Sequence, residues 1–307
     1  MSKTDDSKLK SAERVRKVLT QDLFVRAAAV NATAVVDEMR GIHNSFPVAT
    51  VATGRAMVAS LLMASHLKNK QELSIYIQGN GPLSRVFAEA SFEGKARAYS
   101  TAPHLESPAD SQKILLAPAI GIGLLTVTHH LPMGGPPHRG TVELLTSEIG
   151  DDIAYYLQQS HQIPSVVALG VHVNAYGRVD AAGGVLIELM PGHTEETVRK
   201  IEAAVKAAKP VSQRLLEGAT ADDLLRDYLS DFQLIEMEHD YPIEYSCRCT
   251  AERVKRSVGL LGLEELDEMI EKAEEVEVGC DFCGRKYKIT TAELEEVRRS
   301  VYKSSLN

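Results

Sequence analysis

The spacing of apolar residues changes from helical to alternating within the first hundred residues of the chain. After Pro47, which suits the first turn of a helix, apolar side chains recur every three or four residues as far as Leu67 and predict a helix that reaches about Lys68. Apolar and polar residues then alternate over residues 73–78, up to a breaker of sequence Gly-Asn-Gly-Pro at residues 79–82. This second pattern predicts a strand that ends in a tight turn.

Strand patterns dominate the chain from there to residue 190. Four apolar or β-branched runs predict further strands: 124–128, 141–145, 166–173 and 185–190. The first two flank a connector rich in proline and glycine, so we expect them to be neighbours in a sheet. A helix should open at Ser147 and run through Leu157. Because few helices interrupt the strands, the pattern favours the α+β class, with a mixed sheet-and-helix domain over residues 1–191.

Residues 192–239 have the pattern of short amphipathic helices. Gly218 marks a stop, and Thr220 with Asp223 three residues later is typical of a capping box at the start of the next helix. Short helices are only marginally stable in water alone, so their apolar stripes need an outside surface. We therefore predict an amphipathic helical linker, whose apolar stripes include Ile201, Val205, Leu224, Leu225 and Leu229.

Length and charge narrow the class of protein. A chain of 307 residues is long enough for about two domains, and 44% apolar with 25% charged residues is typical of a globular protein. The 34 basic and 42 acidic residues give a net charge of -8, which disfavours nucleic acid as a partner. The polar, charged start of the chain, residues 1–16, has no secretion-signal pattern, and we expect a cytoplasmic protein. The uncharged run at 114–125 is too short to span a membrane, so we expect no membrane partner.

Common catalytic signatures are absent from the sequence. We find no phosphate-binding loop, no H-E-x-x-H pair and no G-x-S-x-G elbow, and so predict that the protein is not an enzyme and uses no ATP. His129 and His130 end an apolar run, but the sequence identifies no third ligand to complete a metal site. We therefore interpret this histidine pair as structural.

All four cysteines lie near the C-terminus, as a C-x-C pair and a C-x-x-C pair with 30 residues between the pairs: Cys247, Cys249, Cys280 and Cys283. In a reducing compartment such clustered thiols are metal ligands more often than permanent disulfides. Four thiolates are the ligand set of a structural zinc site, and Arg248, Arg285 and Lys286 could offset its charge of -2. We predict one Zn²⁺ per chain in the reduced form, held by a small C-terminal domain over residues 240–307.

Two functions of such a site remain open from the residues alone. The first is a zinc staple with no further role. The second is a sensor, because the residues of each pair can approach the separation that a disulfide needs, and a disulfide sulfur no longer binds zinc. A tail of this size has a small core, while structural zinc contributes about 10–16 kcal/mol of apparent folding free energy. Oxidation would then melt the domain and expose the linker stripes.

The sequence resembles the 33 kDa redox-regulated heat shock chaperones. The two cysteine pairs look like the zinc switch of that family, and residues 78–82, 181–184 and 190–191 look like its N-terminal signatures. The resemblance begins at about Asp22, which leaves residues 1–21 as an unassigned N-terminal extension. It implies an ATP-independent holdase for unfolding client proteins, inactive while reduced and zinc-bound. It also implies disulfides of Cys247 with Cys249 and of Cys280 with Cys283 on oxidation, zinc release, unfolding of the linker, and a homodimer when active.

Two other functions compete with this one. A thiol oxidoreductase using Cys280 and Cys283 is disfavoured because the pair has no thioredoxin-like βαβ context. A zinc-ribbon nucleic-acid binder is disfavoured because residues 240–307 hold 15 acidic and 11 basic residues. In the chaperone interpretation the candidate client-binding surface is the linker stripe named above, and the N-terminal sheet is the alternative.

Overall fold

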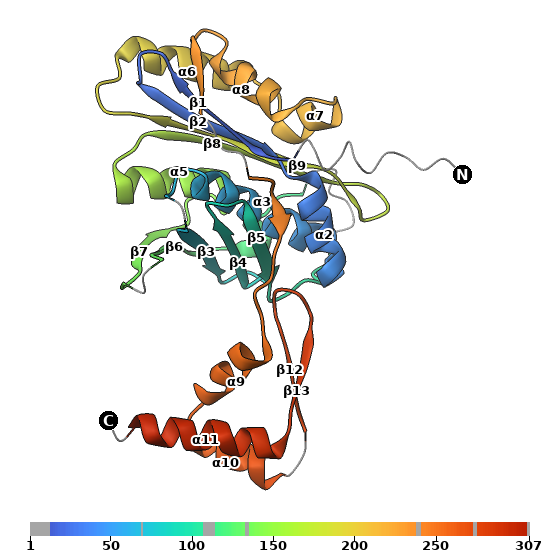
Figure 1. Cartoon of the computed structure of the whole chain (residues 1–307). Helices are drawn as coiled ribbons and strands as arrows, with labels where there is room; N and C mark the ends of the chain where they lie inside the picture. The colour runs from blue at the N-terminus through green and yellow to red at the C-terminus, as the bar shows by residue number, and fades with distance from the viewer. Residues whose placement is uncertain are drawn as a thin grey trace. The chain divides into compact units, whose positions relative to one another are not determined.

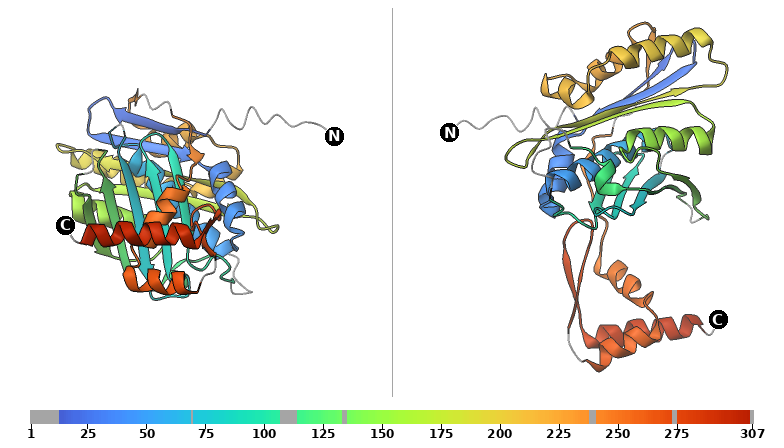
Figure 2. Two further views of the ribbon diagram at one scale, coloured as in Figure 1. Left: turned by 60° about the horizontal axis from the view of Figure 1, so that its bottom comes forward. Right: turned by 180° about the vertical axis from the view of Figure 1, so that it is seen from behind.

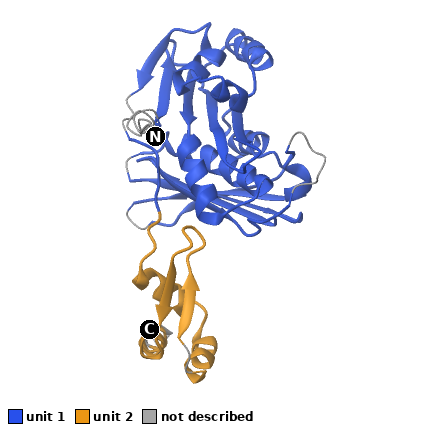
Figure 3. Ribbon diagram, turned by 90° about the vertical axis from the view of Figure 1, so that its right-hand side faces the viewer, with its two compact units in different colours: residues 1–246 blue, residues 247–307 orange. Residues whose placement is uncertain are grey.

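The computed structural model describes residues 13–68, 70–106, 114–132, 135–237, 241–272 and 275–305. The chain forms two compact units, Met1–Ser246 and Cys247–Asn307, shown in two colours in Figure 3. Sheets and helices occur together, which confirms the α+β class. Residues 192–239 belong to the first of these units. The division into a core domain over 1–191, a linker over 192–239 and a zinc domain over 240–307 stays a prediction.

One sheet of the first unit is antiparallel throughout. Its strands follow the order β10 (Leu234–Met237), β1 (Val15–Thr20), β2 (Val25–Asn31), β9 (Val179–Leu189) and β8 (Ser165–Val173). Most of β9 is buried, which explains why residues 185–190 are apolar on both faces except at Glu188, which forms an ion pair with Arg26 at 2.8 Å.

The second sheet has the alternation expected of strands with one buried face. Its order is β11 (Glu244–Tyr245), β5 (Lys95–Ser100), β4 (Arg85–Ser91), β3 (Glu72–Gly79), β6 (Gly123–His130) and β7 (His138–Glu143). Leu73, Ile75 and Ile77 of β3 are buried, as the sequence pattern predicts. Strands β6 and β7 pair antiparallel, which confirms that the runs at 124–128 and 141–145 are neighbours.

A buried helix lies between the two sheets (Figure 1). This helix, α3 (Pro47–Ala64), packs against β4 and β5 of one sheet and against β8 and β9 of the other, and α2 (Thr33–His43) precedes it. By length and composition α3 could cross a membrane, but 89% of its apolar window is buried inside the protein. A helix that is apolar on all sides and buried in this way is a core helix of a globular domain. It ends four residues before the predicted Lys68.

The breaker at residues 79–82 is a site of close backbone approach. The short helix α4 (Ala117–Ile120) packs on this turn, and a Cβ on Gly79 would clash with the carbonyl oxygen of Ile120. A Cβ on Gly81 would likewise clash with the carbonyl oxygen of Ala119. The glycines are therefore required by packing as well as by the turn.

The first unit also corrects the predicted N-terminal extension. Residues 15–20 form β1, which pairs with β10 on one side and β2 on the other, so the prediction of an extension over residues 1–21 is wrong for this segment. The charged Arg16 and Lys17 concealed a strand whose Val15 and Val18 are buried. Residues 1–12 lie outside the described residues.

The helix predicted from Ser147 begins later, because a buried carboxylate organises the preceding loop. Asp152 accepts hydrogen bonds from the backbone N–H groups of Leu145 at 2.7 Å, Thr146 at 3.0 Å and Ile149 at 2.9 Å. These bonds hold the loop outside the helix, so α5 runs over Gly150–Tyr156 and continues into the π-helical turn η1 (Leu157–His161).

The linker helices cover the outer face of the first sheet, as Figures 1 and 2 show. They are α6 (Glu195–Ala207), α7 (Val211–Leu216) and α8 (Ala221–Leu229), and α8 has the capping box predicted at Thr220 and Asp223. Their apolar stripes pack on β1, β2 and β9, so the outside surface that these helices need is the sheet itself. The contacting linker residues include Ile201, Leu224, Leu225 and Leu229, whereas Val205 is 39% exposed.

The second unit is small and has a separate core. It contains α9 (Ala251–Gly259), α10 (Leu263–Glu271), the hairpin β12 (Val276–Gly279) and β13 (Lys286–Ile289), and α11 (Thr291–Ser305). Its buried apolar residues are few within the described segments: Val254, Val258, Leu266, Ile289 and Leu294. Such a core gives the unit little stability of its own.

Candidate metal centre

The fold of the second unit brings the four predicted cysteines together. Cys247 and Cys249 lie in the segment before α9, while Cys280 and Cys283 lie in the turn between β12 and β13. All four Sγ atoms lie within 4.8 Å of one another. The Sγ atoms of Cys247 and Cys280 are 3.6 Å apart, and those of Cys249 and Cys283 are 3.4 Å apart.

Local hydrogen bonds shape the turn that carries the second pair. The N–H of Cys280 donates to the carbonyl of Arg285 at 2.9 Å, and the N–H of Gly284 donates to the carbonyl of Cys280 at 2.8 Å. Gly284 has φ +67°, a left-handed conformation that favours glycine. On the other side, the hydroxyl of Thr250 caps α9, which fixes Cys249 just before the helix.

The sulfur positions fit one tetrahedral ion. Four thiolates at about 2.3 Å from zinc have sulfur–sulfur separations of about 3.8 Å, close to those observed here. A disulfide would require about 2.05 Å, and none of the four cysteines forms one in this structure. The cysteine set is therefore positioned to bind a metal ion.

The electrostatics of the thiols point the same way. Burial raises the pKa of Cys283 to about 12, and hydrogen bonds from neighbouring cysteines add to this. Burial also raises the pKa of Cys280. At Cys249 burial acts in the same direction but is outweighed by hydrogen bonds from Tyr287 and the other thiols, which lower its pKa to about 7. Without a cation, deprotonation of several of these thiols at once is therefore unfavourable. A bound divalent ion would stabilise the thiolates and lower that cost.

Sequence reasoning missed one residue of this site. Tyr287 of β13 donates its hydroxyl to the Sγ of Cys249 and to the carbonyl oxygen of Cys249, both at 3.1 Å. Of the predicted basic residues, Arg285 interacts electrostatically with Cys249 and Cys283, while Lys286 forms an ion pair with Glu277 at 2.7 Å. The sequence did contain a signal for Tyr287. Residues 286–289 alternate as Lys-Tyr-Lys-Ile, and in a strand this alternation places Tyr287 on the opposite face from the two lysines.

The fold and the site define a protein with an α+β body and a small second unit whose four cysteines are positioned to bind a metal ion. Comparison with known proteins is more specific. The sequence model of the family described as Hsp33 protein matches residues 13–290. The chain belongs to the Hsp33 family.

Similar proteins from several bacteria span nearly the same length. The 33 kDa chaperonin of Limosilactobacillus fermentum is 38% identical over 273 residues, which cover 88% of this chain and 93% of the relative. That of Bacillus subtilis is 37% identical over 284 residues, covering 92% and 97%. The crystal structure of the 33 kDa chaperonin of Thermotoga maritima superposes with a TM-score of 0.83 at 31% identity, covering 95% of this chain and 99% of that chain.

Proposed function

We propose that the chain is a redox-regulated, ATP-independent holdase chaperone that binds unfolding proteins under oxidative stress. The observation that carries the proposal is the convergence of four cysteine thiols, none of them in a disulfide, on one ion-sized site in a unit with a very small core. The names of the relatives support a chaperone, and the chemistry of the thiols supports a switch.

In the reduced form, Cys247, Cys249, Cys280 and Cys283 would hold one Zn²⁺. The ion would supply a cross-link between the segment before α9 and the β12–β13 turn, and with it most of the stability of this unit. Two equivalents of peroxide, with four protons, would take four electrons from the four thiolates. Two disulfides, four waters and free Zn²⁺ are the products. Oxidation of the thiolates thus removes the zinc cross-link.

The disulfides that we propose join Cys247 with Cys249 and Cys280 with Cys283. The sulfur contacts of 3.6 Å and 3.4 Å run between the pairs, whereas the proposed disulfides join the sulfurs within each pair. Mass spectrometry of the oxidised chain distinguishes the alternatives. Disulfides within each pair are expected, whereas bonds of Cys247 to Cys280 and of Cys249 to Cys283 would contradict the proposed pairing.

The segment before the thiols connects them to the body of the protein. Glu244 and Lys95 are paired residues of β11 and β5, and the N–H of Ser246 donates to the carbonyl of Ala96 at 2.9 Å. The chain is thus hydrogen-bonded to the second sheet up to the residue before Cys247. Unfolding of residues 247–307 would act on the first unit at this strand.

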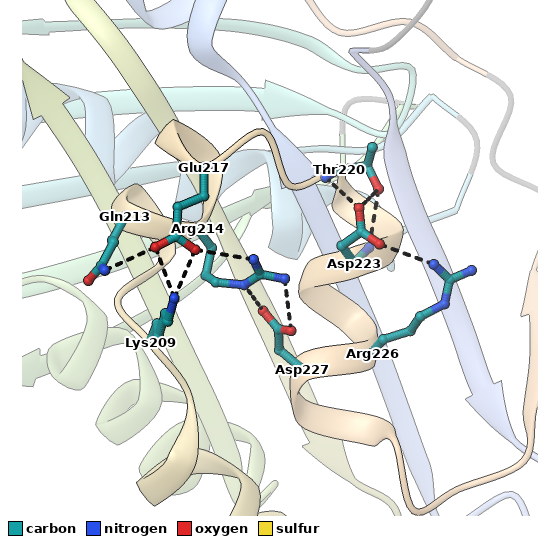
Figure 4. Close-up of polar contacts among 8 residues, drawn as sticks. All are labelled: Lys209, Gln213, Arg214, Glu217, Thr220, Asp223, Arg226 and Asp227. Carbon is teal, nitrogen blue, oxygen red and sulfur yellow. Dashed lines mark hydrogen bonds and ion pairs between the residues drawn. The ribbon is translucent and has the colours of Figure 1, made fainter.

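The proposed client surface is the linker stripe of Ile201, Val205, Leu224, Leu225 and Leu229. Four of these side chains are buried against the first sheet, and burial of each is worth about 1.5–3 kcal/mol. Polar contacts between α7 and α8 add to this (Figure 4). We infer that loss of the zinc unit alone does not free the linker, and that mild heat is needed together with oxidation.

Other aspects of the proposal follow from the same account. The partners are unfolded or partly folded proteins, the active form is a homodimer, and the protein works in the cytoplasm without nucleic acid or membrane. It is a binding protein and not an enzyme. Turnover in an insulin-reduction assay would contradict this and favour the thiol oxidoreductase.

The direct test is a client-protection assay. The zinc-loaded protein is treated with peroxide at mildly raised temperature, and the aggregation of a denatured client is followed by light scattering without ATP. Suppressed aggregation after oxidation, and none before it, is expected. Zinc release with no gain in protection would overturn the proposal.

A single ligand substitution tests the four-thiolate site. Cys280→Ser should lower zinc affinity at least tenfold and leave the chain partly active without oxidant, because one ligand of the staple is lost. Asp281→Ser, an exposed change in the same turn, is the matched control and should retain zinc. Unchanged zinc content in Cys280→Ser would contradict the site.

A further inference from the structure

A second group of metal-binding side chains lies in the first unit, at the end of β6. Four histidines line a cavity of about 280 Å³: His129, His130, His138 and His161. They come from three elements that are separate in the sequence, namely β6, β7 and η1. From the sequence alone, only His129 and His130 can be seen to be neighbours.

Three of these histidines share one face of the second sheet. His129 of β6 and His138 of β7 are directly opposite in the antiparallel register, so their side chains leave the sheet on the same side. On that side η1 packs over β7. Gly140 permits the approach, since a Cβ there would lie 2.8 Å from Cε2 of Tyr156. The ring of His161 is thereby held 5.6 Å from that of His129, centroid to centroid.

His130 has the opposite orientation. Consecutive residues of a strand point to opposite faces, and its Nε2 lies 3.3 Å from the hydroxyl of Ser74. It lines the same cavity but shares no sheet face with His129. This makes His130 a natural control for its neighbours.

One nitrogen of the group is buried without a partner. Nε2 of His129 is shielded from solvent and makes no hydrogen bond within the described part of the chain. A buried polar atom of this kind costs free energy unless a donor, an acceptor or a metal ion satisfies it. Nε2 of His161 lies 3.3 Å from the hydroxyl of Tyr156, a contact that orients the ring as outer-shell partners orient metal-bound histidines.

We propose that His129, His138 and His161 form a second, weaker site for a late first-row transition metal ion, with Zn²⁺ as the first candidate. Neutral imidazole suits zinc, copper and nickel. Two imidazoles bound to one tetrahedral zinc at about 2.0–2.1 Å have ring centroids about 5 Å apart, close to the separation of His129 and His161. His138 is exposed and lies opposite His129 in the strand register, and its ring would complete the site by rotating toward the same ion. Three histidines leave a fourth position for water.

This site differs chemically from the cysteine centre. It has no thiolate, so peroxide that removes zinc from the cysteines should leave it able to bind metal. It does not depend on the redox switch, and either proposal can fail without the other.

Metal stoichiometry of the full-length, reduced chain tests the site. The protein is first loaded with one Zn²⁺ at the cysteines and passed through gel filtration, and then titrated with Zn²⁺ in a calorimeter. A parallel titration with Co²⁺ is followed by absorption, in which a histidine site lacks the thiolate charge-transfer band. We expect a second, weaker equivalent of Zn²⁺, bound by the peroxide-treated chain as well.

The variants assign the ligands. His138→Ala and His161→Ala, both at exposed side chains, should each weaken the second equivalent at least tenfold, and His130→Ala should change it less than twofold. The circular dichroism of each variant verifies folding. The proposal is overturned if the wild type binds no second equivalent, if that equivalent survives both substitutions, or if His130→Ala removes it equally.

Discussion

Several single side chains in this protein hold together segments that are distant in sequence. Tyr287 connects β13 to Cys249 through two hydrogen bonds. Asp37 of α2 accepts hydrogen bonds from the guanidinium of Arg178, at 2.6 Å, and from the N–H of Val179, at 3.0 Å. In both cases a single polar group, the Tyr287 hydroxyl or the Asp37 carboxylate, makes the connecting hydrogen bonds. Removing that one group therefore tests its contribution.

Removal of the Tyr287 hydroxyl should weaken the metal centre. Tyr287→Phe keeps the ring but loses the hydrogen bond to the sulfur of Cys249, and we expect zinc affinity to fall about tenfold, as with other outer-shell partners. Competition with a chromophoric chelator measures it. Tyr302→Phe, at an exposed tyrosine of α11, is the control, and equal zinc transfer from both variants would refute the role of Tyr287.

Asp37 gives the protein a pH-dependent contribution to stability. Burial raises the pKa of Asp37, but hydrogen bonds from Val179 and Arg178 outweigh it and hold the pKa below its ordinary value. The carboxylate therefore stabilises the fold above the unfolded pKa of about 4, and this contribution is lost as pH falls through the lower folded pKa. Asp37→Asn should cost about 1 kcal/mol at pH 7 in urea unfolding. A difference that persists unchanged at pH 3 would contradict this.

The two proposed metal sites differ in how far the sequence predicts them. The four cysteines are identified by their rarity and by the short spacing within each pair. His138 and His161 could not be joined to His129 in advance, because strand register and the packing of η1 over Gly140 bring them together. Such contacts depend on the tertiary structure, and no spacing in the chain encodes them.

At the scale of elements, the linker helices are the segment on which the proposed switch must act. Each of α7 and α8 is short, and their mutual arrangement rests on contacts between side chains (Figure 4). Arg214 of α7 donates to both carboxylate oxygens of Asp227 of α8, at 2.6 and 3.1 Å, and Lys209 pairs with Glu217 at 2.9 Å. Short helices held in this way should open before the sheets do.

Loss of the bridge between α7 and α8 should make the linker easier to open. Arg214→Ala removes the paired hydrogen bonds to Asp227, and we expect amide exchange of α7 and α8 to become several-fold faster in the zinc-loaded protein. Arg226→Ala is the matched control, because Arg226 pairs with Asp223 of the same helix and is more exposed. Equal exchange in the two variants would contradict a role for the interhelical bridge.

Elements with a regular pattern and a matching cap were predictable from the sequence, and the remainder depended on tertiary context. The Thr220 capping box and the β6–β7 pair were correct because local residues specify them. The start of α5 was wrong because Asp152 binds the preceding loop, an interaction that competes with the helix. Strand β1 was missed because its charged residues conceal two buried valines.

At the scale of the whole molecule, stability is divided very unevenly. The apolar clusters of the first unit contain most of the buried residues, and the second unit has a small cluster that shares no residue with them. The two units should therefore respond differently to loss of the proposed zinc, since all four cysteines lie in the second.

Zinc removal should unfold the second unit alone. With a chelator under reducing conditions, we expect α9, α10 and α11 to lose protection in hydrogen exchange, because structural zinc contributes about 10–16 kcal/mol of apparent folding free energy. The two sheets of the first unit should keep theirs. Retained protection of residues 251–305 in zinc-free protein would contradict the metal as the source of that unit's stability.

The central claim is that oxidation of four thiols releases the metal and so activates the chaperone. It is tested most directly by counting zinc and free thiols in the same sample, after gel filtration, before and after peroxide at the temperature at which client protection begins. We predict one zinc and four thiols per reduced chain, and neither zinc nor free thiols in the protein that protects clients. Protection by a chain that still holds its zinc and four thiols would contradict the account.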